Sequence, residues 1–171
     1  MISPKRLSSF LLITLSAILG CAHTPTSGLP PHIKRISIPI FKNTSTRYGL
    51  EKELTDQVTQ EFILDGRLKV MEKDRAEAEL AGEVISYARD DLSYDEDGYV
   101  TEYQIRILLK LKLHDLVKDE VIWEDQQEKS TTYLPQVPGK EENNYETEED
   151  ALDRLVEDLA RAVVVRTTEG W

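Results

Sequence analysis

Residues 99–114, YVTEYQIRILLKLKLH, alternate between apolar and polar side chains more regularly than any other segment of the chain. One face carries Tyr103, Ile105, Ile107, Leu109, Leu111 and Leu113. The other carries Glu102, Gln104, Arg106, Lys110, Lys112 and His114, with Leu108 alone out of pattern. A period of two predicts a β-strand, and one apolar face predicts an antiparallel sheet covered on one side and solvated on the other.

The segments on either side of this strand predict its partners in the sheet. Residues 78–92 form a long strand that Asp97-Gly98 joins to residues 99–114 as a hairpin, because Asp-Gly is a strong turn signal. A second turn at residues 117–120 leads into a strand over residues 121–132. We expect Val121 and Trp123 of that strand to face the core.

The remaining elements follow from apolar spacing. Residues 33–41 predict a strand with Ile36, Ile38 and Ile40 on one face, and residues 42–47 a polar loop. A helix over residues 48–65, a short strand over residues 67–71 and a last helix that begins after Thr147 complete the chain. The order β-α-β-β-β-β-α predicts an α+β two-layer sandwich, with two helices on one face of a four- or five-stranded, mostly antiparallel sheet.

The first twenty residues predict a lipoprotein signal peptide. Lys5 and Arg6 precede an apolar segment over residues 10–20, FLLITLSAILG, which is too short to span a membrane. Ile18-Leu19-Gly20-Cys21 then resembles a bacterial lipobox, which implies lipidation of Cys21 and cleavage before it. We expect residues 1–20 to be removed, residues 21–32 to form an extended tether, and residues 33–171 to fold as a single domain.

Composition restricts the class of function. The formal net charge is −11, so electrostatic binding to nucleic acid is not expected. The single cysteine excludes a disulfide framework, and the three histidines have no spacing typical of metal ligands. The acidic residues lie mostly on helix faces and in turns, where solvation explains them, and no nucleophile motif is present. We therefore expect neither enzyme activity nor a metal or cofactor.

Two surface features are candidate contact sites. Arg106, Lys110 and Lys112, with Arg89 on the preceding strand, could form a basic strip across the solvated face. The alternative is ordinary cross-strand charge pairing with the acidic residues Glu83, Glu102, Glu124 and Glu128. The second candidate is the turn that contains Tyr94, Asp95, Asp97 and Gly98. It fits a calcium loop poorly, because Ser93 and Gln104 replace the first and last acidic ligands, and a hairpin turn is favoured.

A lipoprotein signal is followed by the segments IKRISIPIFKNTSTRYGLEKELT, LDGRLKV, AELAGEVISY and LSYDEDGYVTEY, then by a C-terminal helix that starts EEDAL. In this order the segments resemble the LPS-assembly lipoprotein family (LptE-like). The resemblance covers nearly the whole mature chain and contains no catalytic motif. It implies an outer-membrane lipoprotein that sits as a plug in the lipopolysaccharide-transport β-barrel, helps that barrel to assemble, and assists lipopolysaccharide insertion into the outer leaflet.

A second class of binding protein stays open at this point. Similar β-α-β domains also occur in other envelope lipoproteins, including peptidoglycan-synthase activators and subunits of secretion channels. The alternative function is therefore an activator or scaffold of another periplasmic or secretion machine. Affinity for a barrel or for a periplasmic enzyme domain would distinguish the two.

Overall fold

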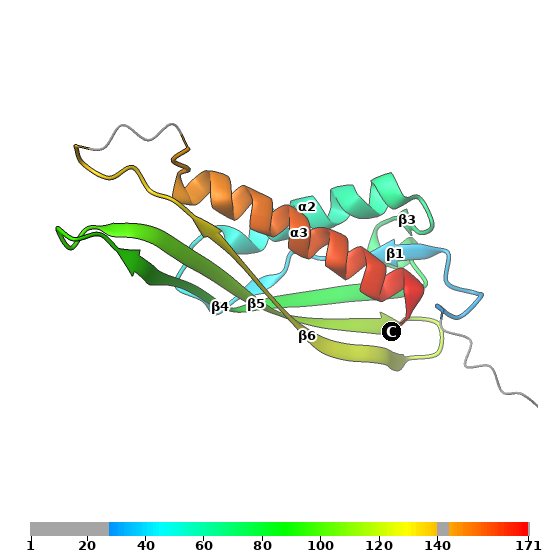
Figure 1. Cartoon of the computed structure of the whole chain (residues 1–171). Helices are drawn as coiled ribbons and strands as arrows, with labels where there is room; N and C mark the ends of the chain where they lie inside the picture. Colours follow the sequence, from blue (N-terminus) through cyan, green and yellow to red (C-terminus); the bar gives the residue numbers. More distant parts are fainter. Residues whose placement is uncertain (1–27, 140–143, 171) are drawn as a thin grey trace, which may run out of the picture.

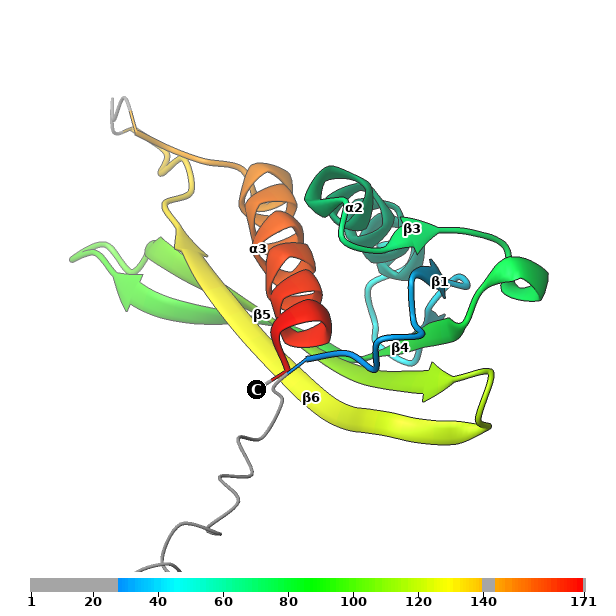
Figure 2. The same ribbon diagram turned by 90° about the vertical axis from the view of Figure 1, so that its right-hand side faces the viewer.

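Two helices cover one face of a single sheet, as Figures 1 and 2 show. The computed structural model describes residues 28–139 and 144–170. Helix α2 (Leu50–Asp65) and helix α3 (Glu148–Glu169) lie side by side on this face, and none of these described residues covers the opposite face of the sheet. The predicted α+β sandwich, with both helices on one side, is therefore confirmed.

The sheet has six strands, and its three long strands are antiparallel. The strands are β1 (Arg35–Ser37), β2 (Lys42–Asn43), β3 (Lys69–Val70), β4 (Ala78–Tyr94), β5 (Val100–Asp115) and β6 (Glu120–Tyr133), and a 3₁₀ turn (Lys73–Arg75) precedes β4. Their order is β3-β1-β4-β5-β6, and β2 also pairs with β4. The short strands pair in parallel, and β2 lies where the sequence predicted a loop.

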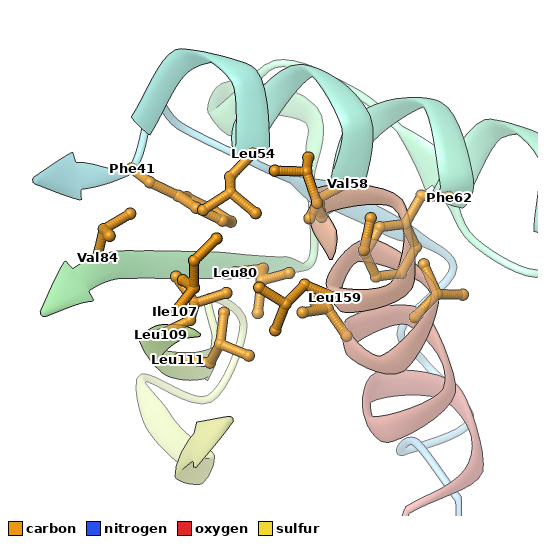
Figure 3. Packing of buried hydrophobic residues seen from close by; sticks show 14 of the residues in the cluster. Phe41, Leu54, Val58, Phe62, Leu80, Val84, Ile107, Leu109, Leu111 and Leu159 are labelled. Atoms are coloured by element: carbon orange, nitrogen blue, oxygen red, sulfur yellow. The ribbon is translucent and has the colours of Figure 1, made fainter. Parts of the chain in front are cut away.

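The alternation that predicted β5 is confirmed residue by residue. Its inward apolar side chains Ile105, Ile107, Leu109, Leu111 and Leu113 are each 0% exposed. Figure 3 shows part of this row packed with Leu80 of β4, Phe62 of α2 and Leu159 of α3. Burial of such a row on one face and charge on the other fixes the register of the strand, since a one-residue slip would bury the charges.

Two expectations about apolar positions were wrong. Val121 was expected in the core but is 47% exposed, because a bulge makes Trp123 the partner of Leu113 and Val121 the partner of His114. The extra residue, Ile122, shifts Val121 to the outer face. Ile40 is 70% exposed because β1 ends at Ser37, before Pro39.

The start of α3 is held in place by its cap and by contacts with the sheet. Thr147 and Asp150 form the predicted capping box: the Asp150 amide donates to Thr147 Oγ1 at 3.1 Å, and the Thr147 amide donates to Asp150 Oδ2 at 3.3 Å. Glu148 then accepts hydrogen bonds from Tyr87 Oη at 2.7 Å and Arg89 Nη1 at 2.9 Å, both on β4. These bonds join the N-terminus of α3 to the sheet below it.

Candidate functional site

The uncovered sheet face carries the three basic residues that the sequence analysis named as candidate contact residues. Arg106, Lys110 and Lys112 alternate with the buried residues of β5, so their side chains project away from the helices. Lys110 lies opposite Glu83 of β4 and Gln126 of β6. The strand pattern therefore places this group on the face that no element among the described residues covers.

Two of the three cations have acidic partners. Arg106 Nη2 lies 2.8 Å from Asp90 Oδ2, and Lys110 Nζ lies 2.7 Å from Glu124 Oε1. The hydrogen bond with Glu124 raises the pKa of Lys110, and the same bond lowers the pKa of Glu124. Lys112 forms no ion pair with any residue that the structure describes. Ion pairs thus account for two cations. Lys112 lies opposite Glu124 without an ion pair to it, although its charge helps to lower the pKa of that carboxyl.

Arg89 does not belong to this group, which corrects the expected strip. The register of the β4–β5 ladder shifts between Val84 and Ser86, so that Arg89 lies opposite Ile105 on the helix-covered side. There its guanidinium lies 4.7 Å from the centre of the Tyr103 ring and donates to Glu148. Arg89 therefore holds α3 onto the sheet and is separated from Arg106 by the sheet itself.

The structure adds Lys42 to the basic residues on this face, a residue that the sequence analysis did not include. Lys42 of β2 pairs with Glu83 in the parallel β2–β4 ladder, at the edge of the same face. With Lys110 and Lys112 it borders a depression of about 250 Å³, which we call the lysine depression. Its other lining residues are Ala81, Gly82, Glu83, Leu111 and Glu124. The three lysines outnumber the two glutamates, so this part of an acidic protein is locally cationic.

The candidate turn lies far from the lysine depression. Asp95 accepts hydrogen bonds from the amides of Asp97 at 3.0 Å and Tyr99 at 2.9 Å, and Gly98 has φ of 85°. These bonds confirm the predicted hairpin turn, whose geometry favours glycine at the positive φ. Glu83 and Tyr94 are eleven positions apart on β4, which is about 36 Å at ~3.3 Å per residue. The two candidate surfaces are therefore separate.

A larger depression, of about 730 Å³, lies between the helices and is acidic. Glu53 and Asp56 of α2 face Asp153 and Glu157 of α3 across it. Burial raises the pKa of Glu53, and the charges of Asp153 and Glu149 raise it further. Repulsion by these carboxylates makes this groove a poor site for an anionic ligand.

Two further observations concern the membrane and metals. No helix among residues 28–139 and 144–170 has both the length and the apolar character needed to cross a membrane. Within the same residues, no three His, Cys, Asp or Glu side chains gather closely enough to hold a metal ion. Cys21, the expected lipidation site, lies outside the described residues.

Several solved structures share this fold. The hypothetical protein CT253 of Chlamydia trachomatis is 9% identical, with a TM-score of 0.58 over 78% of this chain and 95% of that one. Lipoprotein B of Nitrosomonas europaea is 19% identical, with a TM-score of 0.55 over 81% and 83%. A minor lipoprotein of Acinetobacter baumannii is 14% identical, with a TM-score of 0.51 over 80% and 92%. At these identities the likeness concerns the fold alone.

Sequence comparison with protein families is more specific. No curated protein matches the chain. Residues 33–167, however, match the family model LptE, described as lipopolysaccharide-assembly. This range runs from before β1 to near the end of α3, so the match includes every strand and both helices. The chain therefore belongs to the LptE family of lipopolysaccharide-assembly proteins.

Proposed function

We propose that the protein is a non-enzymatic outer-membrane lipoprotein that plugs the lipopolysaccharide-transport β-barrel, helps it to assemble and assists lipopolysaccharide insertion into the outer leaflet. The observation that carries this proposal is the family match over residues 33–167. Acyl chains on Cys21 would anchor the domain, because each buried CH₂ contributes about 0.8 kcal/mol and two or more chains bind a bilayer stably.

The uncovered sheet face supports a role in contacting anionic groups. Lipopolysaccharide carries phosphate and carboxylate groups, and lysine ammonium groups bind such anions as point charges. In the lysine depression, Lys42 and Lys112 have no ion pair with any described residue, while Glu124 already neutralises Lys110. We therefore assign first contact with an anionic headgroup to Lys42 and Lys112, with Arg106 and Lys110 extending the same surface.

The hairpin turn is the second contact surface in this proposal. Tyr94 is 60% exposed and Tyr99 49% exposed at the end of a two-stranded projection that β6 does not reach. Tyrosine combines a large apolar ring with a polar hydroxyl, which suits contact with a partly wet barrel wall. We assign Tyr94, Asp95, Asp97 and Gly98 to contact with the wall.

Purification of the lipidated full chain in mild detergent tests the partner. We expect the lipopolysaccharide-transport barrel to remain bound and to be identified by mass spectrometry of the eluate. Retention of a periplasmic enzyme domain or a secretion-channel protein, with no barrel, would instead support the activator or scaffold alternative and contradict the plug.

Charge reversal tests the sheet face. Changing Arg106, Lys110 and Lys112 together to Glu should leave the circular dichroism spectrum unchanged, because these side chains lie on the uncovered face. Binding of lipopolysaccharide should be lost through like-charge repulsion. The matched control changes Lys52, Lys73 and Arg161 to Glu, which alters the net charge equally at exposed ion pairs elsewhere. A folded triple variant that binds as well as the control would remove this face from the proposal.

A further inference from the structure

A carboxylate with no solvent exposure lies where β5 ends. Asp115 is 0% exposed, and its Oδ1 accepts hydrogen bonds from the amides of Val117 at 2.9 Å and Lys118 at 3.1 Å. Its Oδ2 lies 2.7 Å from Nε2 of His32. Asp115 thus shapes the β5–β6 turn and, through His32, holds a segment 83 positions earlier in the chain.

A second carboxylate holds the same segment. Glu77 accepts hydrogen bonds from the amides of Lys34 at 3.1 Å and Arg35 at 2.7 Å, and from Nε of Arg35 at 2.7 Å. Its own carbonyl accepts from the amide of Leu116, in the β5–β6 turn, at 2.8 Å. We call His32, Arg35, Glu77 and Asp115 the N-terminal clamp. It fastens the beginning of the domain to the β5–β6 turn.

The clamp and the hairpin tip lie at opposite ends of the molecule. Ala78 of β4 pairs with Asp115, and Tyr94 is sixteen positions further along the same strand. At ~3.3 Å per residue, the two ends of β4 are about 53 Å apart. Figure 1 shows the start of the described chain (blue) at the same end of the molecule as the β5–β6 turn, and the hairpin tip at the other end.

The free chain before the domain is short. Leu29 already packs against the core, and the Ile33 amide donates to the Pro30 carbonyl at 3.0 Å. Cys21 precedes Leu29 by eight positions, which span at most about 28 Å when fully extended. A lipid on Cys21 would therefore keep the clamped end within about half the length of β4 from the bilayer.

The two ends also differ in charge. At the β5–β6 turn, Val117 is 65% exposed, and Lys118 forms an ion pair with Glu120 at 3.3 Å. The hairpin tip carries Asp95-Glu96-Asp97, and Glu96 and Asp97 are exposed. The turn also carries the exposed carboxylate of Asp119, which lies 3.2 Å from Nε2 of His114. Because Lys118 offsets one of the two carboxylates of the turn and the tip has no cation, an anionic leaflet repels the acidic tip more than it repels the turn.

We propose that, before the domain enters the barrel, the N-terminal clamp orients the lipidated domain on the bilayer, with the β5–β6 turn facing the lipid surface and the hairpin tip directed away from it. The partner of this end is the lipid headgroup layer. The proposal rests on lipidation of Cys21, which belongs to the proposed function, but it needs neither the barrel nor lipopolysaccharide.

Energy transfer from the protein to the bilayer tests this orientation. The full-length lipidated chain with Val117→Cys or Glu96→Cys is labelled at the new thiol with a fluorescent energy donor. It is then reconstituted in vesicles of phosphatidylethanolamine and phosphatidylglycerol that contain a lipid carrying the energy acceptor. Flotation with the vesicles first establishes the anchor. We expect at least a several-fold higher transfer rate from position 117 than from position 96, because transfer falls steeply with distance.

Substitution of His32 tests whether the N-terminal clamp sets the orientation. His32→Ala should reduce transfer from position 117. The thermal melt should fall, because the buried Asp115 loses one partner, but circular dichroism should stay that of the folded domain, because the amides of Val117 and Lys118 still bind Asp115. His23→Ala, in the same N-terminal segment, is the matched control and should change nothing. Equal transfer from positions 117 and 96, or stronger transfer from 96, would overturn the orientation. Unchanged transfer in His32→Ala would overturn the role of the clamp, and a chain that fails to float would overturn the anchor as well.

Discussion

Gly82 of β4 lies against the ring of Phe41 and has no room for a side chain. A β-carbon added at Gly82 of β4 would lie 2.6 Å from Cγ of the Phe41 ring. Phe41 is 2% exposed and follows the short strand β1, so the ring has little room to move. The absence of a side chain at position 82 therefore lets the β1–β2 segment lie flat on the sheet.

Gly82→Ala should destabilise the domain by about 1–3 kcal/mol, the usual cost of forcing an extra carbon into a packed core. Chemical denaturation monitored by circular dichroism measures this change. Gly28→Ala is the control, because no atom lies within 4 Å of a β-carbon placed there. Equal unfolding midpoints for the two variants would show that the Phe41 ring moves aside without cost.

Glu77 makes the stability of the fold depend on pH. The side-chain hydrogen bond from Arg35, with the amides of Lys34 and Arg35, lowers the pKa of Glu77 to about 2. A carboxylate whose pKa falls on folding stabilises the native state above its unfolded pKa of about 4.5, and this contribution is lost as the pH falls toward the folded value.

The melting temperature of Glu77→Gln should therefore lie below that of the wild type near neutral pH, and the gap should narrow between about pH 5 and pH 2. Differential scanning calorimetry across this range measures the gap. Asp74→Asn, at a carboxylate that is 74% exposed, serves as the control and should melt like the wild type. A gap that stays constant down to pH 2 would contradict the linkage.

At the scale of elements, one glutamate joins α3 to the sheet. Glu148 accepts hydrogen bonds from Tyr87 and Arg89, and Arg47 Nη1 lies 3.2 Å from its Oε1. Burial raises the pKa of Tyr87, and the bond to Glu148 raises it further, so the hydroxyl stays protonated as the donor. Residues from β4 and from the loop before α2 thus meet at the first turn of α3.

Glu148→Ala should cost about 1–3 kcal/mol of stability, because the partly buried Tyr87 hydroxyl loses its acceptor and two arginines lose a shared partner. Glu149→Ala should cost much less, since that carboxylate is 71% exposed and, among the described residues, forms an ion pair only with Arg47. Urea unfolding of both variants makes the comparison. A larger loss for Glu149→Ala would show that the surface pair, and not the Glu148 contacts, holds the helix.

At the scale of the whole molecule, anchoring depends on one thiol. Cys21 is the only cysteine in the sequence, so Cys21→Ala leaves no sulfur for a diacylglycerol. We expect this variant to lose labelling by a palmitate analogue and to depend on the uncut signal peptide for membrane attachment. His23→Ala should label normally. Equal labelling of Cys21→Ala and the wild type would refute the lipobox interpretation.

Features that depend only on neighbouring residues could be predicted from the sequence. The alternation from Tyr103 to Leu113 predicted β5 and its buried face, and Asp97-Gly98 predicted the hairpin. Thr147 and Asp150 predicted the start of α3, because a capping box is complete within four residues. Each of these signals is local, so the pattern and the structure that it produces lie in the same segment.

Which side chains share a surface depends on contacts between distant segments and could not be predicted from the sequence. Two bulges moved Arg89 and Val121 to the faces opposite to those expected, since one extra residue reverses the side to which every later side chain points. Lys42 joined Lys110 and Lys112 because β2 pairs with β4 some forty positions later in the chain. Bulges and long-range pairing depend on how distant strands pack against one another, and no local pattern of residues records that packing.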